Sequence, residues 1–213
     1  MTDPAPNPEA DIAAVMTLAP VIPVLVVQEA AHARPIAEAL VAGGVPALEV
    51  TLRTPAALEV IAEMAGVPGA MVGAGTVTNE AQLDAAITAG ARFIVSPGLT
   101  ERLGRAAIER GIPFLPGTAN AADIMLGLDL GLTRFKFFPA EAAGGTKALA
   151  ALAAPFFQAR FCPTGGVTQA SAPEWLAIPA VTCVGGSWLV PPGEPDRAAI
   201  EARARAAAGL RAV

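Results

Sequence analysis

The feature that most constrains the fold is a repeated alternation of short apolar runs with alanine-rich stretches that have helical spacing. The apolar runs, each predicted to be a strand, lie at 21–27, 47–52, 70–75, 92–96, 113–116, 134–138, 159–163 and 181–185. Successive runs begin about 20 to 25 residues apart with a predicted helix between them, a spacing that requires parallel pairing through right-handed crossovers. The pattern predicts an α/β fold built on parallel strands.

Eight such units favour a closed TIM (β/α)8 barrel, preceded by an N-terminal extension, residues 1–20, with a short helix. An open doubly wound sheet is the structural alternative, although the G-x-G-x-x-G fingerprint common in that fold does not follow the first predicted strand. No low-complexity linker divides the chain after residue 20. We therefore interpret residues 1–213 as a single domain.

Composition excludes several classes of function. Hydrophobic residues make up 54% of the chain, but its apolar runs are shorter than the roughly 20 residues of a membrane-spanning helix, so no membrane partner is expected. The first twenty residues lack a basic leading segment, which favours a cytoplasmic protein over a secreted one. The net charge is −5 and the 14 basic residues are scattered, which argues against nucleic acid and favours a small-molecule substrate.

Cysteine and histidine are scarce. In a chain predicted to be cytoplasmic, Cys162 and Cys183 are interpreted as small buried hydrophobic residues rather than as a disulfide. His32 is the single histidine, and there is no Cys/His cluster, so no metal site is predicted.

Lys136 stands in the apolar run RFKFF, an unusual place for a side chain that is rarely buried. Because side chains alternate along a strand, Phe135 and Phe137 are expected to face the helices and Lys136 the barrel interior. The same alternation in ALEVTLR turns Glu49, Thr51 and Arg53 inward or toward the rim. In a barrel these two strands lie roughly opposite each other, so Lys136 and Glu49 could share a pocket. A buried structural ion pair is the alternative interpretation.

Glycine-rich turns follow several predicted strands: GAGT at 73–76, SPG at 96–98, PTGG at 163–166 and GGS at 185–187. Consecutive glycines let backbone amides approach an anion closely, and the turns after strands seven and eight commonly bind phosphate in this architecture. Tight turns between strand and helix also need glycine for purely structural reasons. The two last turns together favour a phosphate site.

Six stretches in order along the chain resemble the KDPG/KHG aldolase family: LEVTLRT (48–54), VGAGTV (72–77), SPGLT (96–100), FKFFPAE (135–141), RFCPTGG (160–166) and GGSWLVP (185–191). The resemblance begins near residue 20 and covers nearly all that follows, although 116–123 and the tail from Pro191 diverge. It implies a metal-independent, cofactor-free class I aldolase, a homotrimer of TIM barrels. The implied reaction, a step of the Entner–Doudoroff pathway, cleaves the phosphorylated keto acid 2-dehydro-3-deoxy-6-phosphogluconate to pyruvate and glyceraldehyde 3-phosphate. Cleavage of 4-hydroxy-2-oxoglutarate is a possible additional activity.

The resemblance also implies residue roles. Lys136 matches the Schiff-base lysine and Glu49 the general acid/base, while Arg53 and Thr76 match groups that hold the pyruvate carboxylate. The remaining matches either line that pocket or form the phosphate end: Pro97 and Phe138 for the first, and Thr164, Gly165, Gly166, Gly185, Gly186 and Ser187 for the second. The second lysine, Lys147, lies in a predicted helix and is expected to be solvated.

Two other classes of function stay open at this point. A phosphate-binding isomerase or synthase would use Lys136 only to bind an anion, without a covalent step. A phosphometabolite-binding protein would retain the pocket without turnover. The combination of Lys136, Glu49 and Arg53 argues against both, because imine chemistry needs an amine, a proton carrier and a means of fixing the keto acid.

Overall fold

The structure is a computed structural model that describes residues 8–210. Its helices are α1 (Pro8–Met16), α2 (Ala33–Ala42), α3 (Ala57–Ala65), α4 (Glu80–Thr88), α5 (Glu101–Glu109), α6 (Ala121–Asp129), α7 (Gly145–Ala153), α8 (Ala172–Leu176) and α9 (Arg197–Ala208). Its strands are β1 (Val21–Leu25), β2 (Ala47–Thr51), β3 (Met71–Gly75), β4 (Phe93–Val95), β5 (Phe114–Leu115), β6 (Gly117–Thr118), β7 (Arg134–Phe137), β8 (Arg160–Pro163) and β9 (Val184–Gly186).

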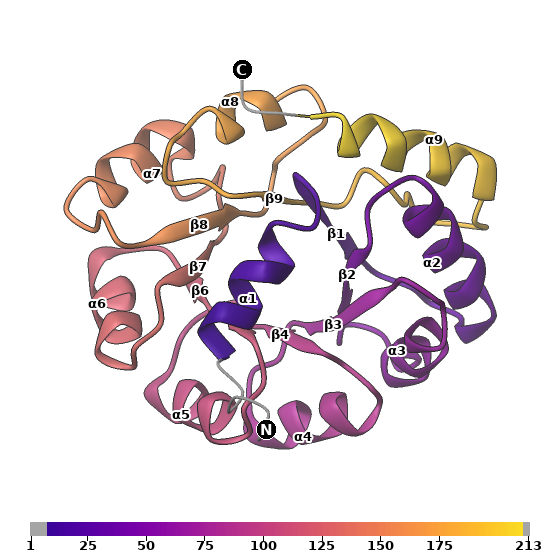
Figure 1. The fold of residues 1–213 in the computed structure, drawn as a ribbon, viewed down its shortest axis with the longest axis horizontal. Coiled ribbons are helices and arrows are strands. Elements are labelled where there is room, and N and C mark those ends of the chain that lie inside the picture. Colours follow the sequence, from indigo (N-terminus) through magenta and orange to yellow (C-terminus); the bar gives the residue numbers. More distant parts are fainter. Residues whose placement is uncertain (1–7, 211–213) are drawn as a thin grey trace, which may run out of the picture.

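Every strand pairing is parallel. Six strands form one sheet in the order β5-β4-β3-β2-β1-β9, and three form another in the order β6-β7-β8. Helices α2 to α9 lie around the outside of these strands (Figure 1). The α/β fold with parallel strands and crossover helices, predicted from the repeated pattern, is confirmed.

The strand expected at 113–116 is the clearest departure from the sequence prediction. It is divided into β5 and β6, which flank Pro116 and pair with different neighbours, β4 and β7. Proline has no N–H to donate to a ladder, and the regular pairing is interrupted at this residue. The Pro116 carbonyl still accepts a hydrogen bond from the Lys136 N–H at 2.8 Å. The chain therefore passes directly from the six-stranded to the three-stranded sheet.

The last predicted strand is also shorter than expected. Regular pairing begins at Val184 rather than at Val181. One isolated parallel bridge joins Phe161 to Val181, upstream of β9, and a second joins Thr164 to Gly185, within β9. The bridges join β8 and the residue after it to β9 and the segment before it, where an edge of one sheet meets an edge of the other.

Side-chain caps fix where several helices begin. The side chains of Asn79, Thr100, Asn120 and Asp196 each accept a hydrogen bond from the backbone N–H three residues later, at the starts of α4, α5, α6 and α9. Such caps satisfy N–H groups that have no partner inside the helix. They fix the start of each of these helices relative to the strand before it.

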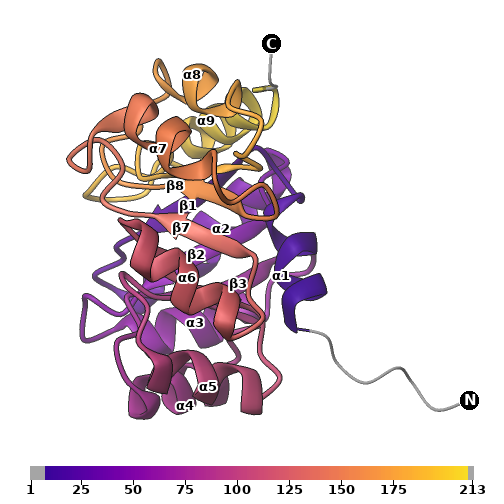
Figure 2. The same ribbon diagram turned by 90° about the vertical axis from the view of Figure 1, so that its left-hand side faces the viewer.

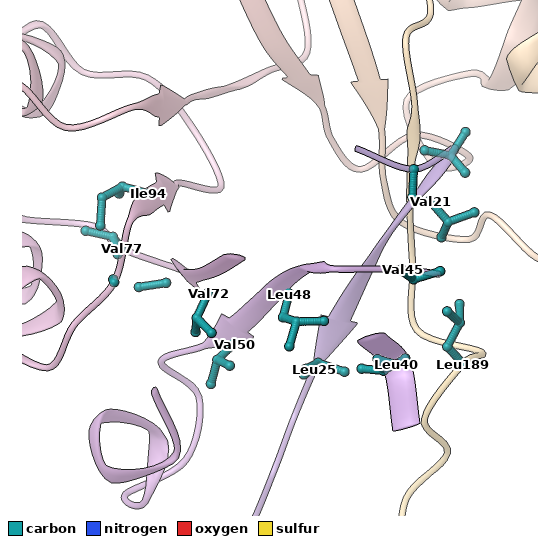
Figure 3. Packing of buried hydrophobic residues seen from close by; sticks show 14 of the residues in the cluster. Val21, Leu25, Leu40, Val45, Leu48, Val50, Val72, Val77, Ile94 and Leu189 are labelled. Atoms are coloured by element: carbon teal, nitrogen blue, oxygen red, sulfur yellow. The ribbon is translucent and has the colours of Figure 1, made fainter. Parts of the chain in front are cut away.

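The hydrophobic core has two parts, one on each face of the strands. The larger part lies between strands and outer helices, where Leu25 and Leu48 lie near Leu40 of α2 (Figure 3). The smaller part lies on the inner face and includes Ile22, Ala47, Phe93, Val95, Leu115, Cys162 and Cys183. Period-two alternation places neighbouring strand residues in different parts, as the sequence predicted.

Helix α1 covers the inner part of the core. Ile12, Val15 and Met16 pack in the same cluster as Phe93, the first residue of β4. Figure 1 shows α1 crossing in front of the strands, and Figure 2 shows that it lies at one end of them. The short helix expected within residues 1–20 is confirmed, although residues 1–7 lie outside the described part. Because α1 covers the amino ends of the strands, their carboxyl ends are left for a site.

Candidate active site

Lys136 and Glu49 meet inside the fold. The Lys136 ammonium lies 2.9 Å from Oε1 and 3.3 Å from Oε2 of Glu49. The two side chains are only 7% and 3% exposed. Glu49 comes from β2 of the six-stranded sheet and Lys136 from β7 of the other sheet, so residues 87 positions apart are in direct contact. The predicted meeting of these two side chains is thus observed.

The flanking phenylalanines divide as strand alternation requires. Phe135 and Phe137 are fully buried in the outer part of the core, whereas the Phe138 ring lies 5.5 Å from the Lys136 ammonium. An ammonium at this distance interacts favourably with an aromatic face, and the ring also excludes water from it. The phenylalanine run therefore serves both packing beneath the helices and the surroundings of the lysine.

A pocket of about 280 Å³ opens around this pair. Its lining residues are Val24, Glu49, Thr51, Arg53, Thr76, Pro97, Lys136, Phe138, Thr164, Gly165, Gly166, Val167, Gly185 and Ser187. All of the site residues predicted from the sequence are among them except Gly186. A Cβ added at Gly186 would overlap the Trp188 ring, so the α-carbon of this glycine packs against the indole.

Three lining residues were not among the predicted site residues. Thr51 is buried, and its hydroxyl donates to the Leu25 carbonyl at 2.8 Å. Its place two residues after Glu49 on β2 is a signal that strand alternation already provides. Val24 and Val167 carry no comparable signal, because a single valine in an apolar segment is indistinguishable from a core residue.

The turn after β3 is shaped around Glu49. A Cβ added at Gly75 would overlap Oε1 of Glu49 and lie 2.7 Å from its Cγ. Glycine at this position therefore leaves the space that the carboxylate occupies. The next residue, Thr76, has a φ of 63°, a left-handed conformation that is costly for a β-branched residue. This strained residue lines the same pocket.

Arg53 provides a positive charge at the exposed side of the pocket. Its Nε donates to the Thr51 hydroxyl at 3.2 Å, and no carboxylate among residues 8–210 forms a salt bridge with it. A planar guanidinium with donors to spare suits a carboxylate ligand, which it can bind through two oxygens. The pocket thus offers an anion partner beside the Lys136–Glu49 pair.

The other side of the pocket is formed by two glycine turns. Gly165 and Gly166 have φ values of 100° and 83°, which favour glycine. A Cβ added at Gly185 would overlap the Thr164 side chain, so the two turns pack closely against each other. Ser187 follows at the exposed rim.

Beneath the pocket, Cys162 and Cys183 are free, buried thiols, as predicted. Hydrogen bonding with Cys162, together with burial, raises the pKa of the Cys183 thiol well above its usual range. That thiol stays protonated at neutral pH and behaves as part of the inner core. In the part of the chain that the structure describes, no three histidine, cysteine, aspartate or glutamate residues are arranged to hold a metal ion.

The buried lysine and its carboxylate partner lie toward the carboxyl ends of parallel strands, where α/β barrel enzymes carry their catalytic groups. The sequence pattern of the KDPG and KHG aldolases matches residues 12–203. The chain belongs to this family. No helix within residues 8–210 is long and apolar enough to cross a membrane.

Individual relatives agree with this assignment. The 2-dehydro-3-deoxy-phosphogluconate aldolase of Zymomonas mobilis is 61% identical over 201 residues, covering 94% of this chain and 97% of that protein. A crystal structure of the 2-keto-3-deoxy-6-phosphogluconate aldolase of Zymomonas mobilis with 3-phosphoglycerate superposes with a TM-score of 0.94 and 60% identity, covering 96% and 98% of the two chains. The KDPG aldolase of Legionella pneumophila, with pyruvate captured as a covalent carbinolamine, gives a TM-score of 0.90 and 44% identity, covering 93% and 98%.

Proposed function

We propose that this chain is a class I aldolase that cleaves 2-dehydro-3-deoxy-6-phosphogluconate to pyruvate and glyceraldehyde 3-phosphate through an imine on Lys136. The observation that carries the proposal is the 2.9 Å contact between the Lys136 amine and the Glu49 carboxylate, in a pocket that the Arg53 guanidinium also lines. Family membership and the names of the Zymomonas relative and of the pyruvate-bound Legionella structure support the same reaction.

The chemistry follows from the difficulty of breaking a carbon–carbon bond next to a ketone. The Lys136 ammonium gives a proton to Glu49, and the resulting amine adds to the C2 carbonyl. Glu49 then returns the proton, and loss of water gives a protonated imine. Glu49 removes the C4 hydroxyl proton, the C3–C4 bond breaks, and its electron pair moves into the imine to give an enamine and the aldehyde. Proton return to C3 and hydrolysis of the imine release pyruvate and restore the amine. One carboxylate can carry the proton in both steps.

The rest of the pocket positions the bond that breaks. Arg53 and Thr76 bind the carboxylate of the keto acid, while Pro97 and Phe138 line that end. The phosphate is bound by Thr164, Gly165, Gly166, Gly185 and Ser187, with Gly186 supporting this turn from behind. Groups that do not react still lower the barrier, because they fix the reacting atoms relative to Lys136 and Glu49. The 3-phosphoglycerate in the related Zymomonas structure supports a phosphorylated ligand.

A second substrate, 4-hydroxy-2-oxoglutarate, fits the same proposal. It shares the keto-acid end that Lys136, Glu49 and Arg53 would handle but has no phosphate for the glycine turns. The family includes KHG aldolases, and cleavage of this substrate is proposed as an additional activity.

We further infer a single domain whose strands form a closed barrel. The direct passage from β5 to β6 at one junction of the sheets, and the bridges of Phe161 and Thr164 at the other, support closure. Under this interpretation β5 and β6 are one interrupted strand, and the barrel has the eight strands predicted. The homotrimer and the cytoplasmic location implied by the sequence also stay predictions.

Borohydride trapping tests the proposed function. With pyruvate present, reduction should add one pyruvyl-derived unit at Lys136, which peptide mapping by mass spectrometry would locate. Lys136→Arg should abolish both labelling and turnover, because a guanidinium keeps the charge but cannot form the imine. Lys147→Arg is the matched control, since Lys147 is exposed on α7 and should leave both unchanged. Turnover by the Lys136→Arg protein would favour a noncovalent isomerase, and a labelled protein without turnover would favour a binding protein.

A further inference from the structure

Glu141 lies directly behind the glycine turn at 164–166, although it is not among the residues that line the pocket. Its backbone N–H donates to the Gly165 carbonyl at 3.0 Å, and the preceding N–H, of Ala140, donates to the Thr164 carbonyl at 2.8 Å. These bonds continue the parallel pairing of β7 with β8 beyond the strand ends. The position of the turn is thus tied to the segment that follows Lys136 and Phe138.

The Glu141 side chain also supports this turn. A Cβ added at Gly166 would overlap Cγ of Glu141 and lie 2.7 Å from its Cβ, so the stem of the glutamate packs on the α-carbon of the glycine. Gly166 has a φ of 83°. A glycine in this conformation has no side chain of its own with which to hold a fixed position. The neighbouring Glu141 stem supplies the missing contact.

The Glu141 carboxylate is in turn held by a buried indole. Trp175 of α8 is fully buried, and its Nε1–H donates to Oε1 of Glu141 at 3.2 Å. The Trp175 ring centroid lies 6.3 Å from that of Phe137, the residue after Lys136. A buried ring has little freedom to move, so an otherwise exposed glutamate is fixed relative to the strand that carries the lysine.

We infer that Glu141 is a positioning residue for the phosphate end of the substrate, acting through Gly165 and Gly166 and itself held by Trp175. The inference rests on the proposed function, because it concerns how that site distinguishes phosphorylated from unphosphorylated keto acids. Glu141 does not bind the phosphate, since a carboxylate there would repel it. Its role is to hold the turn so that the amides of the two glycines stay aligned for the anion.

Three variants measured on two substrates test this inference. Glu141→Ala removes both the stem and the acceptor, and should raise KM for 2-dehydro-3-deoxy-6-phosphogluconate about tenfold while kcat falls less, because the remote binding group is misplaced. Glu141→Gln keeps the stem and an oxygen that accepts from the indole, so it should retain nearly wild-type KM. Trp175→Phe keeps a buried ring but loses the donor, and should lie between the other two. For 4-hydroxy-2-oxoglutarate, kcat/KM should change less than about twofold in all three.

Two further variants serve as a negative and a positive control. Glu174→Ala removes an exposed acid from the same helix as Trp175 and should alter neither substrate. Ser187→Ala removes a direct phosphate donor and should reproduce the selective loss seen in Glu141→Ala. Thermal melting of each variant distinguishes a local change in the turn, which leaves the melting temperature nearly unchanged, from unfolding of the protein. If Glu141→Ala does not fold, Glu141→Gln and Trp175→Phe still test the inference.

The outcomes separate this inference from the proposed function. Normal borohydride labelling of every variant with pyruvate, together with a selective rise in KM for the phosphorylated substrate, supports the inference. Equal losses on the two substrates, or a Glu141→Gln defect as large as that of Glu141→Ala, would overturn it while leaving the aldolase assignment intact. A wild-type protein that pyruvate does not label would overturn both.

Discussion

At the scale of single residues, glycines in and after the strands create space for side chains of neighbouring segments. Gly75 accommodates the Glu49 carboxylate, Gly185 accommodates Thr164, and Gly73 accommodates the ring of Phe93. In each case an added Cβ would overlap a neighbouring side chain. The glycine-rich turns are therefore explained partly by packing, and not only by turn conformation or anion binding.

Gly75→Ala tests this residue-scale explanation. The new methyl group would overlap Oε1 of Glu49 and displace the carboxylate from Lys136. The proton-transfer rate should then fall by about a hundredfold to ten-thousandfold, the usual contribution of general acid/base catalysis. The measurement is the rate of deuterium exchange into the methyl group of pyruvate. Gly66→Ala is the control, because its added Cβ would make only ordinary contacts, the nearest at 3.5 Å. Normal exchange in Gly75→Ala would mean that Glu49 can move without consequence or is not the proton carrier.

At the scale of elements, α1 is held by tertiary packing rather than by its own stability. It has nine residues, and an isolated helix of that length is marginal in water. Ile12 and Met16 are fully buried against the inner core, at the end of the strands opposite the pocket. We therefore interpret α1 as a plug that closes the amino end of the interior.

Ile12→Ala measures the contribution of that plug. Large-to-small changes at buried aliphatic positions cost about 2–5 kcal/mol, because transfer free energy is lost and a cavity is left. Urea denaturation should show a loss in this range, with kcat nearly unchanged. Leu18→Ala is the comparison: Leu18 lies just beyond α1 and is 43% exposed, so its loss should cost less than about 0.5 kcal/mol. An equally small loss of unfolding free energy in both variants would mean that the packing of α1 against the strands contributes little to stability.

At the scale of the whole molecule, the site requires the two sheets to keep a fixed position relative to each other. Glu49 belongs to the six-stranded sheet, whereas Lys136 belongs to the three-stranded sheet. A change in the relative position of the two sheets would break the 2.9 Å contact between these side chains. The closed barrel that we propose would prevent such a change, because each sheet edge would be joined to the other sheet.

Hydrogen exchange tests closure. The Phe161 N–H donates to the Ala180 carbonyl at 2.8 Å, and the Thr182 N–H donates to the Phe161 carbonyl at 3.0 Å, across the junction of β8 with the segment before β9. In a closed barrel these amides should exchange as slowly as the Leu52 amide, which donates to Gly75 within the six-stranded sheet. Markedly faster exchange at Phe161 and Thr182 would show that this edge opens independently.

The sequence alone was enough to predict the parallel α/β fold, the N-terminal helix and nearly all of the pocket. Strand periodicity is a local property, so alternation assigns Lys136 and Glu49 to the inner face without knowledge of their partners. Residues such as Thr76, Pro97 and Phe138 were instead predicted from the family resemblance. Buried, unpaired thiols at Cys162 and Cys183 were predicted on another ground, the expectation of a cytoplasmic chain. Residue roles beyond this came from the family resemblance and await the experiments above.

Tertiary structure decided what depends on neighbours distant in sequence. The division of a predicted strand at Pro116 depends on which strand pairs on each side of the proline, and the position of Gly186 depends on the Trp188 ring. The contacts of Glu141 with Gly166 and Trp175 likewise join the segment after β7 to the turn after β8 and to α8. Such contacts leave no periodic signal in the sequence, because they arise from the spatial proximity of segments whose spacing along the chain follows no rule.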